Sequence, residues 1–357
     1  MATDDLVVGV IFPAKKIEHL RDVLHEARDG VRFVLVDLYD PRVTSAQSLV
    51  RVYGRLDALL HKLAHEMVFA RLGDPAAAQR LALVHEFARQ QPGLAVIDPI
   101  ASVELLTDRQ AACERLVQLQ QQRHAHDAPH AAAGAVPAFS VPAFRVTRSR
   151  EDFDVLVSAV DSGAMRLPLI CKSVEACATD RSHLMSVITQ RDDLEFVEYP
   201  AIYQEFINHS GRLFKGYVLG DLVNVAERRS LPNLAAGAAQ VHFNTQKQYP
   251  TTADFHPTAA AGDSDNDNDN DNDSRADATA TVTVTRTQPE IFAAVRAIGE
   301  SIREELGLTL FGFDVIVSDA SQELLVIDVN YFPSYKELDD FSGALRQHLK
   351  QRCVSKA

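Results

Sequence analysis

The segment "LLVIDVNYFPSY", residues 324–335, begins like a buried strand and then carries polar residues. Its first four residues are apolar, Asp328 and Asn330 follow, and Phe-Pro ends the run. Because side chains alternate across a strand, Asp328 and Asn330 point to the same side. A carboxylate and an amide on one side of a strand predict a metal site. A polar strand end that leads into a turn is the alternative interpretation.

The preceding residues supply a partner strand. "LTLFGFDVIV", the turn "SDASQ" and "ELLVIDVN" predict an antiparallel hairpin over residues 308–330. If the turn centres near Ser321, Asp314 lies opposite residue 327 or 328. Asp314, Asp328 and Asn330 would then converge, as oxygen ligands of a hard cation do. Magnesium fits best, because few carboxylates and the phosphates of a substrate hold it, and this implies a nucleotide. Pairing of these acids with lysine or arginine is the alternative.

Composition indicates a globular protein with room for two or three domains. The chain has 357 residues, of which 46% are hydrophobic and 24% charged. Its net charge of −13 owes much to "DSDNDNDNDNDSRAD", residues 263–277, and argues weakly against nucleic-acid binding. No apolar run is long enough to span a membrane, and acids stand where a signal peptide needs bases. We therefore expect a cytoplasmic protein, with the nucleus as a further compartment, and a monomer.

The first hundred residues alternate strands and helices, which is typical of βαβ units with a parallel sheet. The expected strands are 6–12, 31–38, 56–63 and 94–98, and the expected helices are 15–27 and about 78–91. One helix is predicted from about 101 to 123, followed by a loose linker rich in His, Ala and Pro. Strands are expected within 167–174, 201–207 and 213–230, and helices from 289 to 306 and from about Leu338.

The alternating Asp and Asn residues of 263–277 cannot bury apolar surface, so an insert over about 250–280 is predicted to be disordered. The segment lacks the glycine and glutamate of a calcium-binding EF-hand loop. The four cysteines form no CxxC pair and no zinc-binding spacing, which favours structural thiols.

Lys172 lies within the apolar strand "LPLICKSV", where a lysine facing a cleft suits contact with the α- and β-phosphates of a nucleotide. A core lysine that extends its amine to the surface is the alternative. "IYQEFINH" places Gln204 at the end of a strand, where backbone groups could read an adenine edge. That segment alone is weak evidence.

Several motifs occur in one order: "IDPIASVELLTDR", "ICKSVEACATDRSHLM", "YQEFINHSGRLFKGYVLG", "AERRSLPNL", "LFGFDVIV" and "IDVNYFPSY". Together they resemble the inositol-tetrakisphosphate 1-kinase (inositol 1,3,4-trisphosphate 5/6-kinase) family, over about residues 5–345. The resemblance implies an α/β (α+β) ATP-grasp fold, with a Rossmann-like βαβ domain (1–98) that binds inositol phosphate. Two mixed lobes (99–202 and 203–350) would clamp ATP. The implied activity is ATP- and Mg²⁺-dependent transfer of the γ-phosphate to the 1-, 5- or 6-hydroxyl of an inositol tris- or tetrakisphosphate.

The resemblance also implies the roles of individual residues. Two magnesium ions would be held by Asp314, Asp328 and Asn330. ATP would be bound by Arg109, Lys172, Gln204, the backbone near Glu205 and Ile207, and Ser230. The inositol phosphate would be bound by Lys16, Lys62, His183, Lys215 and Arg228, with Asn330 and Ser334 beside it. Lys172, Lys215 and Asp314 would serve catalysis by offsetting or holding charge. His183 would orient or deprotonate the accepting hydroxyl, or only bind phosphate.

Two positions depart from the family pattern. Ala178, in "ACAT", and Ser334, in "FPSY", stand where the family has glycine. Alanine resists a positive φ, so closure of the first loop over phosphate is in question, and Ser334 puts the choice of substrate in question. Two other functions stay open: an ATP-grasp carboxylate–amine ligase, and an inositol phosphate binder without activity. The dispersed cations Lys16, Lys62, His183 and Lys215 favour the kinase.

Overall fold

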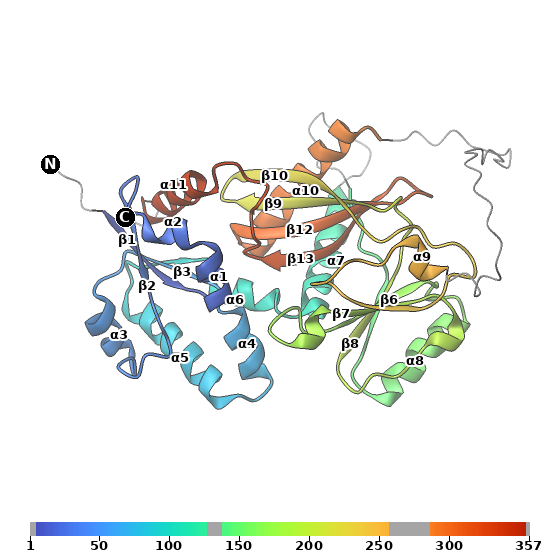
Figure 1. Ribbon diagram of the computed structural model, residues 1–357, viewed down its shortest axis with the longest axis horizontal. Helices are drawn as coiled ribbons and strands as arrows, with labels where there is room; N and C mark the ends of the chain where they lie inside the picture. Colours follow the sequence, from blue (N-terminus) through green and yellow to red (C-terminus); the bar gives the residue numbers. More distant parts are fainter. Residues whose placement is uncertain (1–4, 127–137, 257–285, 355–357) are drawn as a thin grey trace, which may run out of the picture.

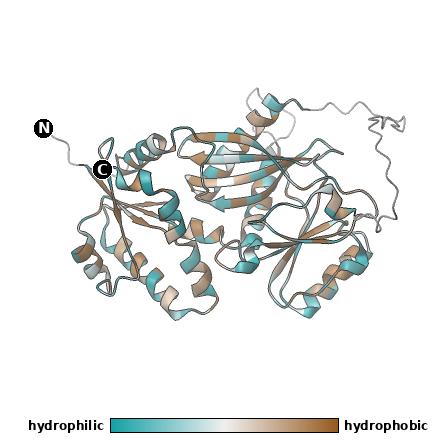
Figure 2. Cartoon of the chain, viewed as in Figure 1, coloured by the Kyte–Doolittle hydropathy of each residue, from teal (hydrophilic) through white to brown (hydrophobic). Residues whose placement is uncertain are grey.

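Three sheets make up the fold of the computed structural model, which describes residues 5–126, 138–256 and 286–354 (Figure 1). Most of their strands are hydrophobic, whereas the surrounding helices also carry hydrophilic residues (Figure 2). Among the described residues, no helix has both the length and the apolar character needed to cross a membrane. The mixed parallel and antiparallel sheets confirm the predicted α/β (α+β) class.

The N-terminal sheet is parallel, with the strand order β2-β1-β3-β4. Its strands are β1 (Leu6–Ile11), β2 (Val31–Leu35), β3 (Ala58–His61) and β4 (Ala95–Ile97). Its helices are α1 (Ala14–His19), α2 (Arg21–His25), α3 (Ala46–Tyr53), α4 (Ala64–Arg71) and α5 (Pro75–Gln90). Because the order reverses between β1 and β3, a ligand crevice is expected beyond the carboxyl ends of these two strands.

The central sheet is antiparallel, with the order β11-β7-β6-β8-β5. Its strands are β5 (Phe144–Thr147), β6 (Leu169–Ser173), β7 (Leu184–Ile188), β8 (Ala201–Glu205) and β11 (Val241–Asn244). Its other elements are α8 (Arg150–Asp161), α9 (Thr252–Phe255) and the 3₁₀ helices η1 (Asp180–His183) and η2 (Arg191–Asp193). Strand β11 lies after residue 203, where the C-terminal lobe was predicted to begin. The chain therefore returns to the central sheet after it has entered the C-terminal sheet.

The C-terminal sheet is antiparallel, with the order β10-β9-β12-β13. Its strands are β9 (Arg212–Leu219), β10 (Leu222–Arg229), β12 (Leu310–Val317) and β13 (Leu324–Tyr331). Helix α10 (Gln288–Leu306) packs on β9 and β10, and the last helix, α11 (Phe341–Val354), returns to contact β4 of the N-terminal sheet. The predicted hairpin and the helix predicted from 289 to 306 are confirmed.

Two sequence predictions need correction. The single helix expected from 101 to 123 is two helices, α6 (Ile100–Leu105) and α7 (Arg109–His126). The break lets the backbone of residues 107–109 bond to residues 174–176, through Ala176 N–H to the Thr107 carbonyl and Arg109 N–H to the Val174 carbonyl. The acidic insert was expected to begin at 250, but α9 is a helix whose Phe255 is buried. The rest of that insert, from 257, lies outside the described residues.

The hydrophobic core is divided unequally. One continuous core joins residues of the N-terminal sheet, such as Val8 and Leu60, to residues of the C-terminal sheet, such as Phe311 and Val326. The central sheet has a separate core against α8, built around Phe153 and Tyr203. The N-terminal and C-terminal sheets are therefore packed as one unit, and the central sheet is packed against them as another.

Candidate active site

Lys215, Asp314 and Asp328 form one row across three neighbouring strands. Asp314 on β12 lies opposite Lys215 on β9 and opposite Asp328 on β13. The Lys215 Nζ donates to Asp314 Oδ1 at 2.5 Å, and Asn330 Nδ2 donates to Asp328 Oδ2 at 2.6 Å. The register expected from a turn near Ser321 is therefore confirmed, and the three oxygen-bearing side chains lie together.

The two carboxylates differ electrostatically. Burial raises the pKa of Asp314, and the Asp328 charge adds to this, while Lys215 opposes it. Burial also opposes ionisation of Asp328, but Arg109, Lys172 and the Asn330 amide together outweigh it and lower the pKa of that carboxyl. Asp328 is thus the better ionised ligand, and Asp314 depends on a nearby cation.

The row fits a magnesium ion. Two buried carboxylates that face each other repel unless a cation lies beside them, and carboxylate and amide oxygens are suitable ligands for Mg²⁺. The described residues contain no cluster of three or more His, Cys, Asp or Glu side chains arranged for a metal. Two carboxylates and one amide are few ligands for Mg²⁺, which usually takes its other ligands from water and substrate phosphates.

Lys172 lies on the central sheet, facing β13. Its side chain is buried, and its Nζ donates to Gln204 Oε1 at 3.1 Å. Burial lowers the pKa of Lys172, and the Asp328 charge opposes this. The Gln204 Nε2 is buried without a hydrogen-bond partner. Lys172 and Gln204 line one small pocket with Arg109 and Asp328, so the expected nucleotide contacts lie beside one of the expected metal ligands.

Arg109 supports the loop that follows Lys172. Its guanidinium is buried and donates to the carbonyls of Ser173 (2.7 Å), Glu175 (2.8 Å) and Ser182 (3.0 Å). Three carbonyls of one loop thereby converge on one side chain. In this structure Arg109 holds the shape of the 173–182 loop, and its predicted contact with ATP stays a prediction.

His183 ends that loop as the last residue of η1. Its carbonyl accepts from Thr245 N–H at 2.9 Å, and its Nδ1 lies 3.4 Å from the Thr245 hydroxyl. Burial and the charges of Arg109 and Lys15 lower the pKa of His183, which favours the neutral ring at pH 7. A neutral ring can accept a proton, as either of its predicted roles allows.

Lys16 and Lys62 converge although they are far apart in the chain. Lys16 follows β1 and Lys62 follows β3, on the two sides of the crevice position. The Lys16 Nζ donates to the Pro333 carbonyl at 2.6 Å, and the Lys62 Nζ to the Phe332 carbonyl at 2.9 Å. The two amines thus meet at the end of β13, directly after the predicted metal ligand Asn330.

Among the residues that the structure describes, none forms an ion pair with Lys16 or Lys62. Burial, assisted by the Lys62 charge, lowers the pKa of Lys16 to about 7. Burial also lowers the pKa of Lys62. Carbonyls accept from both lysines, and the Lys16 Nζ also lies 4.2 Å from the centroid of the Phe332 ring. An anion would stabilise such a site, because its charge would favour both ammonium groups.

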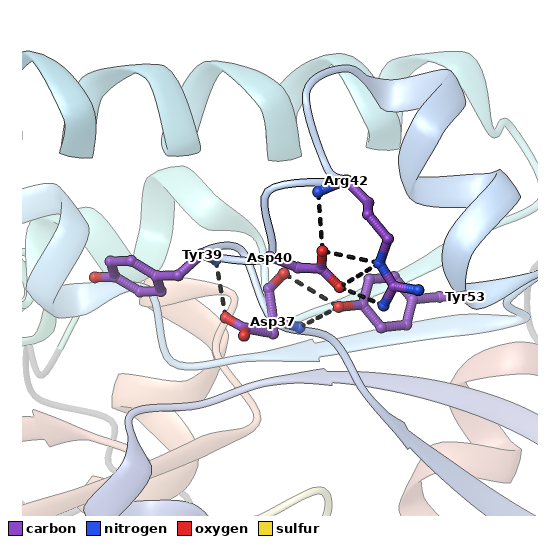
Figure 3. A network of polar contacts seen from close by, with 5 residues as sticks. All are labelled: Asp37, Tyr39, Asp40, Arg42 and Tyr53. Atoms are coloured by element: carbon purple, nitrogen blue, oxygen red, sulfur yellow. Dashed lines mark hydrogen bonds and ion pairs between the residues drawn. The ribbon is translucent and has the colours of Figure 1, made fainter.

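The loop after β2 contributes no such cation. Its one basic residue, Arg42, binds Asp40 through Nε at 3.0 Å and Nη2 at 2.6 Å (Figure 3). Asp37 is held in the same network, where its backbone N–H donates to the Tyr53 hydroxyl at 3.0 Å. The cations that meet at the end of β13 are instead Lys16, in α1 after β1, and Lys62, directly after β3.

The hinge between the central and C-terminal sheets is only partly available to a ligand. The Glu205 carboxylate binds Arg166, and the Glu205 N–H donates to the Ala143 carbonyl at 2.8 Å. The Ile207 carbonyl is contacted by His209 Nδ1 at 2.7 Å. These groups are engaged within the protein, so the predicted backbone contacts at Glu205 and Ile207 stay predictions.

Two further predicted residues lie on or beside the outer strand β10. Arg228 forms an ion pair with Glu337, and the Ser230 N–H donates to the Gly211 carbonyl at 2.8 Å. Neither side chain contacts Lys215 or Asp314 directly in the described structure. Their roles stay predictions.

Comparison with known proteins decides the family. The inositol 1,3,4-trisphosphate 5/6-kinase ATP-grasp domain matches residues 135–351, more than half of the chain. The chain belongs to the inositol 1,3,4-trisphosphate 5/6-kinase family. Membership makes it an inositol phosphate kinase, and ATP and Mg²⁺ are the nucleotide and metal that an ATP-grasp kinase implies.

Relatives in this family match nearly the whole chain. It is 27% identical to inositol-tetrakisphosphate 1-kinase 1 of Arabidopsis thaliana, over 96% of this chain and 93% of the relative. It is 25% identical to inositol-tetrakisphosphate 1-kinase of Xenopus laevis, over 90% and 71% of the two chains. It is 30% identical to inositol-tetrakisphosphate 1-kinase 5 of Oryza sativa subsp. japonica, over 72% and 69%.

Solved structures support the fold of the family. The ATP-grasp ligase PsnB aligns with a TM-score of 0.55 and 14% identity, over 98% of this chain and all of the other. An ATP-grasp RimK domain protein of Sphaerobacter thermophilus aligns with a TM-score of 0.52 and 17% identity, over 96% and 99%. These similarities confirm the predicted ATP-grasp fold.

The two departures from the family pattern have different structural consequences. Ala178 has a φ of 76°, in the left-handed region that favours glycine. In the other segment, Phe332 and Tyr335 have positive φ values, and Ser334 does not. Alanine is therefore strained at 178, whereas Ser334 has no such strain and directly follows in the chain Phe332 and Pro333, whose carbonyls accept from Lys62 and Lys16.

One residue near the family's site has no signal in the sequence. Tyr249 follows β11 in an irregular loop, and its ring contacts Phe243 at 5.7 Å between centroids. Tyr249 is 47% exposed, and partial desolvation together with the Asp314 charge raises its pKa. Only its place in the folded chain reveals this, because the loop carries no motif.

Proposed function

We propose that the chain transfers the γ-phosphate of ATP to a hydroxyl of an inositol tris- or tetrakisphosphate, at the 1-, 5- or 6-position. The observation that carries this proposal is the convergence of Lys16 and Lys62 at the end of β13, next to the carboxylate row. Cations that lack an acidic partner lie beside metal ligands, as transfer between two phosphorylated molecules requires.

For the nucleotide, Lys172 would contact the α- and β-phosphates, and the hinge from Gln204 would receive the adenine. Arg109 would shape the 173–182 loop around the phosphates, and Ser230 would lie near the nucleotide. Two magnesium ions held by Asp314, Asp328 and Asn330 would neutralise charge on the β- and γ-phosphates. Carboxylates that repel each other in the free chain support this assignment.

For the acceptor, Lys16, Lys62 and Arg228 would each bind a separate phosphate group, because an ammonium is a compact charge that suits one group. Asn330 and Ser334 would line the same space. Lys215 pairs with Asp314 in the free chain. With both substrates bound, its ammonium would also stabilise negative charge on the transferring oxygens. This position between metal ligand and acceptor supports a catalytic role for Lys215.

No strong general base is required, because phosphoryl transfer has a loose transition state in which positioning and charge stabilisation dominate. His183 has a lowered pKa, so its neutral ring would accept the proton of the attacking hydroxyl or hold that hydroxyl in line. In phosphate binding His183 would instead donate a ring N–H to a phosphate oxygen and take no proton from the hydroxyl. A pH profile of kcat in a His183→Gln variant separates the two roles.

The test is turnover with ATP, Mg²⁺ and a panel of defined inositol tris-, tetrakis- and pentakisphosphates, with the products identified by phosphorus NMR. We expect a phosphorylated inositol product in equal amount to ADP for at least one acceptor. ADP release without such a product at saturating acceptor would contradict the proposal.

The other functions make different predictions in this assay. An ATP-grasp ligase would consume ATP only with a carboxylate and an amine, and the similarity to ligases such as PsnB concerns the fold alone. A binder without activity is motivated by the strained Ala178, and it would bind inositol phosphates without ADP release. Lys16 and Lys62 favour the kinase over the ligase, because a carboxylate–amine site has no use for separate phosphate-binding lysines.

A further inference from the structure

The N-terminal and C-terminal sheets meet at a buried joint. They share one hydrophobic core, and Arg346 of α11 adds two hydrogen bonds of 2.8 Å, to the carbonyls of Val23 and Glu26 near the end of α2. At the centre of the contact lies Asp98, directly after β4 and fully buried. A carboxylate in such a place is costly unless several donors satisfy it.

Asp98 is satisfied by the opposite sheet. Its Oδ2 accepts from the backbone N–H groups of Thr309 (2.7 Å) and Leu310 (2.9 Å), and its Oδ1 accepts from the Thr309 hydroxyl at 2.5 Å. Its own N–H donates to the Tyr331 hydroxyl at 3.0 Å. Its carbonyl lies 2.8 Å from His61 Nε2. Every polar group of this residue is thus directed at a particular partner.

Each hydrogen-bond partner of Asp98 is close in the chain to a residue of the proposed active site. His61 is the residue before Lys62. Thr309 and Leu310 begin the strand that carries Asp314. Tyr331 is the residue between Asn330 and Phe332, whose carbonyl accepts from Lys62. Asp98 therefore connects an acceptor-binding lysine with both metal-binding strands, through one set of buried hydrogen bonds.

In the hydrogen bond between His61 and Asp98, the structure shows which residue donates. Burial lowers the pKa of His61 to about 4, so the ring is neutral at physiological pH. The His61 Nδ1 has no hydrogen-bond partner, which places the ring proton on Nε2, where it donates to the Asp98 carbonyl. The end of β3 is thereby fixed to the end of β4 just before Lys62.

We propose that Asp98 is a positioning residue of the kinase reaction, which sets the distance between Lys62 at the acceptor and the metal-binding strands β12 and β13. The inference rests on the proposed function, because it assigns Lys62 to the acceptor. Asp98 touches neither substrate. Its effect is exerted through Lys62 on one side and through Asp314 and Asn330 on the other.

The role predicts an uneven effect on the two substrates. The nucleotide contacts Lys172 and Gln204 belong to the central sheet, which has its own core, and within the described residues neither is a hydrogen-bond partner of Asp98. Loosening the joint should therefore weaken binding of the acceptor and slow the transfer, while binding of ADP without Mg²⁺, which does not use the metal ligands, changes little. General destabilisation would instead affect both substrates alike.

Three variants test this. Asp98→Asn keeps the size of the side chain but replaces one acceptor oxygen with an amide that cannot accept. Thr309→Val keeps the backbone donors and removes the hydroxyl, which also lies 2.8 Å from His348 Nε2 of α11. Val84→Ala, on α5 in the same core but away from the joint, is the matched control for lost stability. KM for the acceptor, kcat, the Kd of ADP without Mg²⁺ and the thermal midpoint are measured for each.

We expect Asp98→Asn to raise the KM of the acceptor about tenfold and Thr309→Val about threefold, with the Kd of ADP changed less than about twofold. Val84→Ala should lower the thermal midpoint without a larger effect on the KM of the acceptor than on the Kd of ADP. If Asp98→Asn does not fold, Thr309→Val decides alone. Equal changes for both substrates, or a larger effect on the acceptor in Val84→Ala as well, would overturn the proposal.

Hydrogen exchange gives a readout that does not depend on turnover. In Thr309→Val and Asp98→Asn, amide exchange should rise together in residues 309–317 and 58–63, and in Val84→Ala it should rise only within the N-terminal sheet and its helices. If the wild-type chain phosphorylates no inositol phosphate, the proposed function fails, and exchange decides on Asp98. If the wild type is active and the two segments do not respond together, the positioning role fails.

Discussion

Asp314 and Asp328 lie directly opposite each other on neighbouring strands, one with a pKa that burial raises and one whose pKa nearby cations lower. The free chain therefore holds two carboxylates that repel each other, with Lys215 compensating one of them. A divalent cation would relieve this repulsion. The pair should thus bind metal even without nucleotide, although more weakly.

Magnesium should therefore stabilise the free chain, and Asp328→Asn should abolish that effect. A ligand at a hundred times its Kd adds about 2.7 kcal/mol to the free energy of unfolding, which differential scanning calorimetry detects as a higher midpoint. We also expect kcat to fall at least about a hundredfold in the variant, because a metal ligand is lost.

The matched control is Asp192→Asn, at an exposed aspartate of η2. It should keep both the magnesium-dependent shift and the activity. An Asp328→Asn variant that still responds to magnesium like the wild type would contradict the metal assignment.

Lys172→Met should separate nucleotide binding from stability. The variant removes a charged donor of about 2 kcal/mol, so KM for ATP should rise about thirtyfold. The pKa of Lys172 is lower in the folded chain, so the unfolded chain binds the extra proton and the charge costs stability at neutral pH. The thermal midpoint should therefore stay equal or rise.

The control is Lys350→Met, at an exposed lysine of α11, which should alter neither KM for ATP nor the thermal midpoint. An unchanged KM for ATP in Lys172→Met would refute nucleotide binding by Lys172.

The hairpin shows how much the sequence could predict. The alternation of side chains and a turn near Ser321 placed Asp314 opposite residue 327 or 328, because a short turn fixes the register of an antiparallel pair. A register shift between Asp314 and Val315, which no sequence pattern predicted, puts Asp314 opposite Asp328. The parallel N-terminal sheet and α10 follow from periodicity in the same way. The family motifs then named the remaining candidates.

Other features depend on contacts that no local pattern encodes. The helix break before Arg109 arises because residues 107–109 bond to a distant loop. Phe332 has a φ of 46°, which turns its carbonyl to Lys62, and an aromatic residue gives no sign of such a conformation. Asp98 ends the apolar run "LAVID" much as Asp328 ends its own strand, but the donors that satisfy it begin at Thr309.

Ala178→Gly should stabilise the chain. An alanine in the left-handed region lowers the free energy of unfolding by about 1–2 kcal/mol, and glycine removes this strain. Glycine also increases the entropy of the unfolded chain, which offsets about 0.4–1 kcal/mol of the gain. The net gain should be about 0.5–1 kcal/mol, a rise of about 1–3 °C in the thermal midpoint. Ala176→Gly, in the same loop but without a positive φ, should lower the midpoint instead. A lower midpoint for Ala178→Gly would show that the loop is not strained as its φ of 76° indicates.

Ser334→Gly should change the choice of acceptor rather than stability. Ser334 has no positive φ, so glycine relieves no strain there. Its hydroxyl lies next in the chain to the Pro333 carbonyl that accepts from Lys16. We expect kcat/KM to change by several-fold for some inositol phosphate isomers and not for others, with KM for ATP unchanged. Equal effects on all isomers would argue that Ser334 lies outside the acceptor site.

Affinity for the inositol phosphate should fall as the pH rises from 7.5 to 9. The pKa of Lys16 is about 7 in the free chain, so its amine is mostly neutral in this range. A bound phosphate favours the ammonium, so the complex takes up a proton, and the affinity decreases by up to about tenfold per pH unit. The phosphate groups are almost fully charged there, since their second pKa is about 6.

Calorimetric titration in two buffers of different ionisation enthalpy measures the proton uptake. Lys16→Arg keeps its charge at every pH in the range, so it should bind with a smaller pH dependence, leaving the contribution of Lys62. Equal slopes for Lys16→Arg and the wild type would show that Lys16 does not bind the acceptor.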